Sequence, residues 1–343
     1  MVSMKNNFKE FIKDKKVLVT GGTGSIGRVL VRELLRYSPA VIRVFSRDAA
    51  KQLEFQNELQ NDRRVRFILG DIRDKERLLS VCEDVNVIFH AAAFKYVPQG
   101  EYNPFEVVQT NVDGTQNLIS SALKTPSVTH FVMISTDKAV HPVNTMGASK
   151  LLAERLVSAA HYMKGKKNKV FTTVRFGNVL GTSGSVIPLF REQIKRGEVL
   201  VTHPEMTRFF MTVPDAVRLV FDASTIARGG EIFVLKMPAL AVKDLADVFI
   251  SKFALKPVSI KFSGIRPGEK LNEALLTAEE ARSTLETDRM FIIVPQVETN
   301  DIFVKDYSYS GAKPLASVFY DTNLAPKLSK EEISKLLDMG GIV

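Results

Sequence analysis

The stretch that decides the fold is Thr20-Gly21-Gly22-Thr23-Gly24-Ser25-Ile26-Gly27. A short apolar run at 16–19 precedes it, and apolar residues at helical spacing follow it over 28–35. Strand, glycine-rich turn and helix in this order are typical of a dinucleotide-binding turn. One glycine permits the tight turn, one lets the backbone approach a pyrophosphate, and one lets the helix pack on the strand. We therefore expect a pyrophosphate at the N-terminus of this helix. The candidate contacts are Gly21, Thr23, Gly24, Ser25, Ile26 and Gly27.

The rest of the first half repeats the alternation of strand and helix. Apolar, strand-like runs occur at 41–45, 65–69, 85–90, 130–134 and 170–175, and long helices are predicted over 103–124 and 144–163. This order predicts an α/β fold with a doubly wound parallel sheet of the Rossmann type. Asn111, within the first long helix, is expected to be a structural hydrogen-bonding residue and not a catalytic one.

The second half has shorter elements, and its loops are rich in Pro, Gly, Arg and Lys. A predicted helix at 213–226 and strand at 231–235 are expected to return to the first domain. We expect 1–176 plus about 213–240 to form the dinucleotide-binding domain. About 177–212 and 241–343 are expected to form a smaller, discontinuous α/β substrate domain, with candidate substrate segments at 183–188, 206–210 and 266–270.

Composition restricts the class of protein and its compartment. The single cysteine, Cys82, excludes an intramolecular disulfide and favours a reducing compartment. No run of about 18 apolar residues is present, and 1–16 lacks the apolar centre of a signal peptide, so we expect a cytoplasmic chain without a membrane span. The net charge of +9 is spread along the sequence, and the five histidines have no metal-ligand spacing. We expect neither a nucleic-acid partner nor a metal.

The end of the second predicted strand bears on the choice of cofactor. An acidic residue there would bind the ribose 2′-hydroxyl of NAD. Here Ser46 and Arg47 follow the strand, with Lys51 close behind. A guanidinium suits a phosphate, so we expect NADP rather than NAD, although Asp48 leaves NAD open.

Two further strand ends carry candidate site residues. The small side chains of Ala91, Ala92 and Ala93 after the fourth strand would let the backbone pass beside the ribose of the cofactor. Asp137 and Lys138 follow the fifth strand, where a carboxyl and an amine together suit acid and base catalysis. A surface ion pair is the alternative interpretation.

These motifs resemble the extended branch of the short-chain dehydrogenase/reductase superfamily. In that superfamily Asp71 and Ile72 would contact adenine, and Lys150 would bind the nicotinamide ribose and lower the pKa of a tyrosine four residues before it. Met146 occupies the tyrosine position here, and a thioether takes no proton. The enzyme is therefore either inactive or uses another base.

A more specific resemblance is to the UDP-N-acetylhexosamine 4,6-dehydratases of the polysaccharide biosynthesis family, over about 15–295. The segments that carry it are 46–48, 92–98, 101–104, 136–150, 184–186, 206–209 and 266–270. Some members have methionine where this chain has Met146. The chain resembles the short soluble members, which form dimers or hexamers, so we expect a homo-oligomer.

The resemblance implies an internal redox cycle on a UDP-N-acetylhexosamine. Hydride leaves C4 for NADP⁺, water is lost across C5 and C6, and hydride returns to C6. By family analogy Lys138 is the C5 base and Asp137 the acid, while Asp137 or a water held by Thr136 relays the C4 proton. The expected substrate-binding residues are Lys95, Asn178, Arg208, Arg266 and Glu269, with the two arginines on the phosphates. Lys95 is also expected to contact the cofactor, because it would lie where cofactor and sugar meet.

Two other functions remain open. A UDP-sugar 4-epimerase shares the fold but lacks elimination, and Asp137-Lys138 favours the dehydratase over it. An NADP-binding regulator without activity is suggested by Met146. Inversion at C5 is expected on the resemblance alone.

Overall fold

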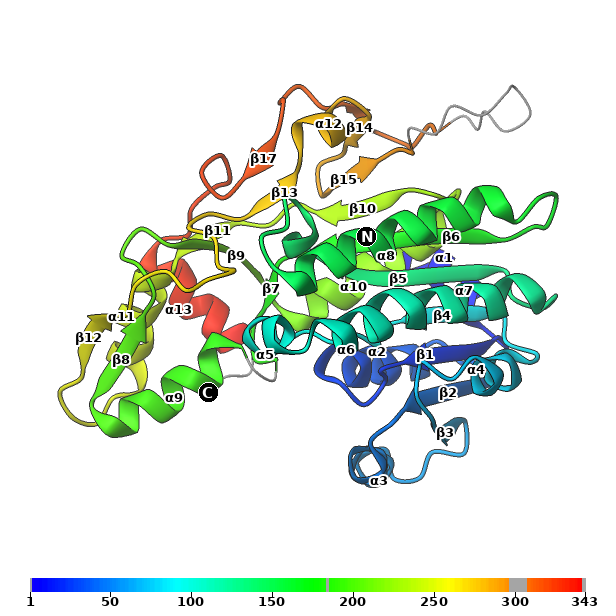
Figure 1. Cartoon of the computed structure of the whole chain (residues 1–343), viewed down its shortest axis with the longest axis horizontal. Coiled ribbons are helices and arrows are strands. Elements are labelled where there is room, and N and C mark those ends of the chain that lie inside the picture. The colour runs from blue at the N-terminus through cyan, green and yellow to red at the C-terminus, as the bar shows by residue number, and fades with distance from the viewer. Residues whose placement is uncertain (1, 183–184, 296–306, 341–343) are drawn as a thin grey trace.

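A ten-stranded sheet forms the centre of the computed structural model, which describes residues 2–182, 185–295 and 307–340 (Figure 1). Seven of its strands are parallel, in the order β3-β2-β1-β4-β5-β6-β10. They are β1 (Lys16–Thr20), β2 (Val41–Ser46), β3 (Val65–Leu69), β4 (Val87–His90), β5 (His130–Thr136), β6 (Val170–Phe176) and β10 (Ile232–Leu235). The predicted α/β fold with a doubly wound parallel sheet is confirmed. Strands β2 and β3 are added on one side of β1, and β4, β5 and β6 on the other, so the strand order switches between β1 and β4.

Both faces of the sheet are covered, because side chains alternate along each buried strand. Val17 and Val19 of β1 point into one core, while Leu18 points into the other. The first face carries α1 (Val2–Ile12), α2 (Ser25–Leu35), α3 (Ala49–Glu58) and α10 (Val213–Ile226). The second carries α4 (Lys75–Cys82), α7 (Gly114–Lys124) and α8 (Thr145–Met163). Within the described residues, no helix is both long and apolar enough to cross a bilayer.

The helix predicted over 103–124 is interrupted. Helices α5 (Val97–Tyr102) and α6 (Pro104–Val108) are followed by a π-helical turn, Gln109–Asp113, and then by α7. Asn111 lies in this turn and is almost fully buried. Its side chain accepts from the Phe94 backbone N–H (2.7 Å) and donates to the Phe94 carbonyl (3.0 Å). The wider turn thus lets a polar side chain hold the loop that follows β4, as is common for π-bulges near functional sites.

The smaller domain has a core of its own. Its sheets contain β7 (Asn178–Val179), β8 (Glu198–Val201), β9 (Thr207–Met211), β11 (Ala239–Ala241) and β12 (Ser259–Phe262). Its helices are α9 (Val186–Arg196), α11 (Val242–Phe253) and α13 (Lys330–Met339). Apolar residues of these helices form a separate cluster that includes Phe190, Phe249 and Leu337. Ser329 begins α13 with a capping box, in which its side chain accepts from the backbone N–H of Glu332.

The C-terminal part of the chain returns to the large sheet. Strands β15 (Met290–Ile293), β14 (Thr284–Glu286) and β16 (Lys313–Pro314) add to β10 in antiparallel order. A hairpin of β13 (Ala274–Leu276) and β17 (Tyr320–Asp321) and the short α12 (Ala278–Ala281) complete this part. The sequence predicts that 241–343 belongs wholly to the substrate domain, whereas β14, β15 and β16 extend the large sheet. The free edge of β10 accounts for the difference, since it accepts new backbone hydrogen bonds.

Candidate active site

The glycine-rich turn after β1 lies against the loop after β4. Gly21 has a φ of +66°, and a Cβ there would lie 2.7 Å from the Ala92 backbone nitrogen and 2.8 Å from the Ala91 carbonyl oxygen. Gly27 lies against Gly21 and Gly22 so closely that a side chain would collide with their backbone. Helix α2 begins after Gly24, which has no side chain to cap the first N–H groups. The turn therefore fits a pyrophosphate at the N-terminus of an eleven-residue helix.

The other residues predicted in this turn have mixed surroundings. Thr23 is buried, and its carbonyl accepts from Arg28 Nε (3.1 Å). Ile26 packs against the first core, and Ser25 opens α2. Ala91, Ala92 and Ala93 follow β4, and the backbone of Ala91 and Ala92 lies against Gly21.

The end of β2 presents a guanidinium beside a carboxylate. Arg47 is 60% exposed, and its Nη1 lies 3.8 Å from Asp71. Arg73 binds Asp71 at 3.0 and 2.8 Å, and this hydrogen bonding lowers the pKa of the Asp71 carboxyl. The Asp48 carboxylate makes contacts within its own helix. It caps α3 by accepting from Lys51 N (3.0 Å), and it forms an ion pair with Lys51 Nζ (3.1 Å).

Ser46 and Ile72 have structural contacts as well. Ser46 Oγ accepts from Gln52 Nε2 at 3.0 Å, and Ile72 is buried against Gly114 of α7. Lys95 lies over the Tyr96 ring at 5.5 Å, and burial lowers the pKa of its ammonium.

A buried histidine supports the floor of the site, and sequence analysis missed it. His90 hydrogen-bonds Thr20 through Nδ1 (2.7 Å) and Thr115 through Nε2 (2.9 Å). Burial lowers the pKa of this histidine to about 3, so the ring stays neutral. Through these bonds His90 of β4 connects β1 and α7. The only sequence signal for such a role is the position of His90 at the end of a predicted strand.

Lys150 and Met146 are both buried on α8. Lys150 Nζ donates to the Ile134 carbonyl of β5 (2.7 Å), and burial lowers the pKa of the ammonium to about 8. Met146 is 4% exposed and packs near Gly100. The methionine is therefore a buried apolar residue about one helical turn before the lysine.

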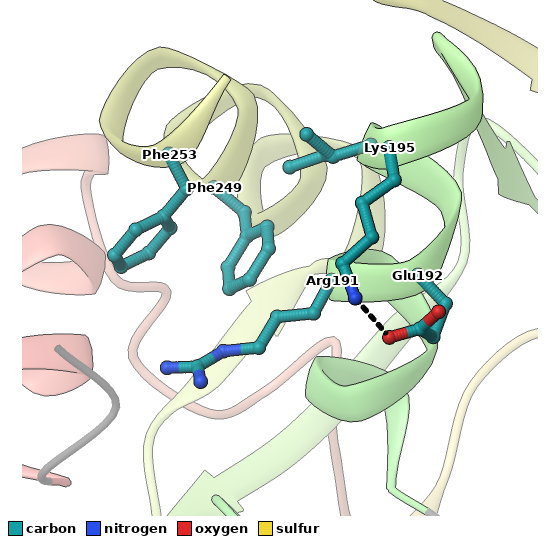
Figure 2. A pocket seen from close by; sticks show the side chains of 6 residues that line it. Arg191, Glu192, Lys195, Phe249 and Phe253 are labelled. Atoms are coloured by element: carbon teal, nitrogen blue, oxygen red, sulfur yellow. Dashed lines mark hydrogen bonds and ion pairs between the residues drawn. The ribbon is translucent and has the colours of Figure 1, made fainter. Parts of the chain in front are cut away.

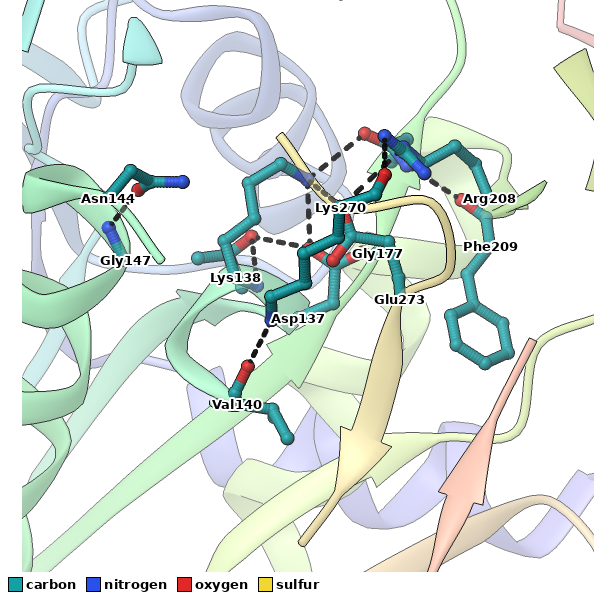
Figure 3. Close-up of polar contacts among 12 residues, drawn as sticks. Asp137, Lys138, Val140, Asn144, Gly147, Gly177, Arg208, Phe209, Lys270 and Glu273 are labelled. Carbon is teal, nitrogen blue, oxygen red and sulfur yellow. Dashed lines mark hydrogen bonds and ion pairs between the residues drawn. The ribbon is translucent and has the colours of Figure 1, made fainter. Parts of the chain in front are cut away.

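Asp137 and Lys138 begin a 3-10 turn, Asp137–Ala139, at the carboxyl end of β5 (Figure 3). Asp137 is fully buried, and its Oδ1 accepts from Thr136 Oγ1 (2.9 Å) and Lys138 Nζ (3.0 Å). Its Oδ2 has no hydrogen-bond partner among the described residues. Lys138 Nζ also donates to Asn178 Oδ1 at 3.3 Å. The pair is thus oriented from β5 and β7 together and is no surface ion pair.

A second carboxylate, missed by sequence analysis, faces Lys138. Glu273 Oε1 lies 3.7 Å from Lys138 Nζ and 3.5 Å from Arg208 Nε (Figure 3). Burial alone would lower the pKa of the Lys138 ammonium, but Asp137 and Glu273 outweigh burial and raise it. Burial raises the pKa of the Glu273 carboxyl. Nothing in the local sequence pairs Glu273 with Lys138, because the two lie far apart along the chain.

The loop before Glu273 is tied to the site by backbone contacts. Arg208 donates to the carbonyls of Thr207 (2.8 Å), Leu271 (3.1 Å) and Lys270 (2.8 Å). Lys270 Nζ reaches the Val140 carbonyl (2.5 Å), and Asn144 Nδ2 the Gly268 carbonyl (2.8 Å). Most of the Arg208 guanidinium is therefore used inside the protein, and its predicted phosphate contact stays a prediction.

The remaining predicted substrate residues lie around this loop. Arg266 is exposed, and Glu269 is half-buried with an Oε2 that has no hydrogen-bond partner in the described part of the chain. Asn178 donates to the Phe209 carbonyl (3.1 Å) in addition to its contact with Lys138. Of the segment predicted at 183–188, residues 183 and 184 lie outside the described residues.

A surface hollow of about 360 Å³ lies elsewhere, between α9 and α11 (Figure 2). Its lining residues are Arg191, Glu192, Ile194, Lys195, Phe249 and Phe253. It belongs to the outer side of the smaller domain and contains none of the predicted site residues. Across residues 2–182, 185–295 and 307–340, no cluster of three or more potential metal ligands is present.

Comparison with protein families and curated proteins gives consistent relatives. A model described as "Polysaccharide biosynthesis protein" matches residues 17–295. An uncharacterised membrane protein of Methanocaldococcus jannaschii is 48% identical, covering 97% of this chain and 98% of the relative. A UDP-N-acetylglucosamine 4,6-dehydratase (inverting) of Campylobacter jejuni is 38% identical over 95% and 97%. A UDP-glucose 4-epimerase of Rickettsia rickettsii is 39% identical over 94% and 95%.

Solved structures share the fold. Pen from Bacillus thuringiensis superposes with a TM-score of 0.90 at 42% identity, covering 97% of this chain and all of that one. A dTDP-glucose 4,6-dehydratase from Streptomyces venezuelae, solved with NAD and TYD bound, gives a TM-score of 0.67 at 26% identity, over 75% and 86%.

Proposed function

This chain belongs to the polysaccharide biosynthesis protein family, and we propose that it is a UDP-N-acetylglucosamine 4,6-dehydratase. Dehydratase relatives span nearly the whole chain, and dehydratases are hydro-lyases, so the chain is an enzyme of the lyase class. The expected product is a UDP-4-keto-6-deoxy-N-acetylhexosamine for surface glycan or nonulosonic acid biosynthesis.

One observation carries the proposal. The acid–base pair of the site is Asp137 and Lys138, 3.0 Å apart at the end of β5, while the position four residues before Lys150 is an apolar methionine. Elimination of water needs both a base at C5 and an acid at the C6 hydroxyl, and this pair supplies an amine and a carboxyl side by side. An epimerase has no need of the second group.

The chain's own residues suit the steps that involve protons. Lys138 in its neutral form would take the C5 proton after C4 has become a ketone, because the ketone makes that proton acidic. Asp137 would take the proton of the C4 hydroxyl as hydride leaves C4, and would then deliver that proton to the departing C6 hydroxyl. Thr136 holds the Asp137 carboxylate through a 2.9 Å hydrogen bond. Met146 is buried and would take no proton, so we propose for it only an apolar contact with the sugar.

A nicotinamide cofactor would take the C4 hydride and return it to C6, so that none is consumed. Gly21, Gly24 and the first turn of α2 fit its pyrophosphate, and Lys150 is the candidate contact for its nicotinamide ribose. We propose NADP over NAD, because Arg47 is exposed at the end of β2 whereas Asp48 already caps α3.

The test is to incubate the protein with UDP-N-acetylglucosamine and NADP⁺ and to follow the sugar by NMR. A 4-keto-6-deoxy sugar is expected. Accumulation of the C4 epimer would favour the epimerase function, which is the named function of some relatives of this chain. An unchanged sugar would favour the inactive regulator. Lys138→Ala should lower turnover about 10²–10⁴-fold and stop exchange of the C5 hydrogen in D₂O, whereas UDP-sugar binding should remain.

Two finer points remain proposals. We propose inversion at C5, which proton couplings measured early in the reaction would show, and retention there would leave the dehydratase assignment intact. We also propose a homo-oligomer, between a dimer and a hexamer, which sedimentation would measure.

A further inference from the structure

Lys138 is a poor base as it stands in the site. Its ammonium lies 3.0 Å from Asp137 and 3.7 Å from Glu273, and two carboxylates stabilise the protonated form. A base must lose that proton before it can take one from the sugar. The group that accepts it has to lie within reach of Nζ and must be easy to protonate.

Asp137 lies nearer to Nζ than Glu273 does, at 3.0 Å against 3.7 Å. In the proposed mechanism, however, Asp137 has to carry the proton for the C6 hydroxyl, so the proton of Lys138 needs a second acceptor, and Glu273 is the other carboxylate beside Nζ. The Asp137 carboxylate also receives two hydrogen bonds on Oδ1. Glu273 is 3% exposed, its Oε1 makes only the two long ion pairs, and its Oε2 has no hydrogen-bond partner among the described residues. A buried carboxylate with so few donors is the one that neutralises most readily.

We propose that Glu273 accepts the proton that Lys138 must lose before Lys138 can act as the C5 base. One N–H bond of Lys138 breaks and one O–H bond of Glu273 forms, so an ammonium–carboxylate pair becomes an amine–carboxylic acid pair. The total charge is unchanged and no electrons are transferred. Because Glu273 acts through Lys138, it is a positioning residue, and the inference rests on the proposed function.

Substrate binding would drive this transfer. The Lys138 side chain is 23% exposed, so water still stabilises its charge. A sugar covering it would remove that water, and a neutral pair then becomes favourable in the drier site. Asp137, Arg208 and Lys270 are the other charged groups that face Glu273; Asp137 favours its protonation, and the two cations oppose it.

The test compares Glu273→Gln and Glu273→Asp, with Glu205→Gln as a control for loss of an exposed carboxylate in the same domain. The wild type and Glu273→Asp should show C5 hydrogen exchange and turnover that change little above neutral pH. Glu273→Gln should be about 10²-fold slower at neutral pH. It should recover as the pH rises, because Lys138 must then lose its proton to solvent.

Two results would overturn the proposal. A Glu273→Gln rate that is lowered equally at every pH would mean a structural role only. A faster rate at neutral pH would mean that Glu273 acts only as a negative charge that keeps Lys138 protonated.

A measurement without turnover separates this inference from the proposed function. Carboxyl carbons of ¹³C-labelled glutamate are followed by NMR, and the Glu273 signal is assigned by its loss in Glu273→Gln. We expect this carboxyl to titrate above the usual glutamate value of about 4.3. An ordinary titration contradicts the proposal, whether or not the sugar is converted.

Discussion

Gly147 of α8 lies directly against the carbonyl oxygen of Lys138. A Cβ at Gly147 would collide with that oxygen and would lie 3.2 Å from Asn144 Oδ1. The first turn of α8 is thereby the surface on which the 3-10 turn of Lys138 rests. A glycine that looks like an ordinary helix residue in the sequence fixes the position of the candidate base.

Gly147→Ala should displace that turn, because the colliding atom is backbone and has little freedom to move. We expect a loss of about 1–3 kcal/mol in the free energy of unfolding and a large loss of turnover. Ala148→Gly, one residue further along the exposed side of the helix, should cost about 1 kcal/mol and leave turnover intact. Denaturant titration and a product assay measure the two effects, and full activity in Gly147→Ala would contradict the contact.

Lys150 should make stability depend on pH in the alkaline range. Burial lowers the pKa of this ammonium from its usual 10.5 to about 8 in the folded chain. Unfolding therefore takes up a proton between those values, so the free energy of unfolding should rise with pH there. Subtracting the profile of Lys150→Met isolates this slope from other titrating groups, and two parallel profiles would disprove it.

Arg47 should determine the preference for NADP. Arg47→Ala should weaken NADP binding by about 1–3 kcal/mol, the range of a charged hydrogen bond, and leave NAD binding nearly unchanged. Calorimetric titration with both cofactors measures the difference. Arg63→Ala, an exposed arginine before β3, serves as the control, and an equal loss for both cofactors in Arg47→Ala would count against this role.

A buried ion triad should hold α8 and α12 to β6. Arg175 is fully buried and binds Glu154 (2.6 Å) and Glu280 (2.8 Å). Arg175→Met should lower the free energy of unfolding by about 3–5 kcal/mol, because it leaves two buried carboxylates without their partner. Adding Glu154→Leu and Glu280→Gln should restore much of the loss, as measured by denaturant titration. A triple variant no more stable than the single one would contradict this account.

The sequence predicted the parallel sheet well because its signals are local. Apolar periodicity located the helix 213–226 to the residue, and the glycine-rich turn identified the loop after β1. The pair Asp137 and Lys138 was found because both follow one strand. These features depend on neighbours in the chain, where pattern and propensity act directly.

The rest depends on contacts between distant segments. Glu273 lies beside Lys138 because the loop 266–273 packs against the end of β5. No short sequence pattern predicts a contact between segments so far apart in the chain. Strands β14 and β16 have three and two residues, too few for any periodicity to show. The sequence did not predict the π-helical turn at Asn111 for a related reason. The Asn111 side chain hydrogen-bonds the backbone of Phe94, which lies outside this helix.

The last strand of the large sheet has a consequence for solubility. Strand β16 consists of Lys313 and Pro314 only, and both are exposed. Proline has no N–H to offer a further strand, and a charged lysine beside it opposes stacking with another chain. The sheet thus ends in an edge strand, the border of the sheet, that forms few backbone hydrogen bonds with other polypeptides. A chain cut before this border would leave the backbone edge of β14 without its neighbour, and we would expect such a chain to pair with other copies of itself more readily.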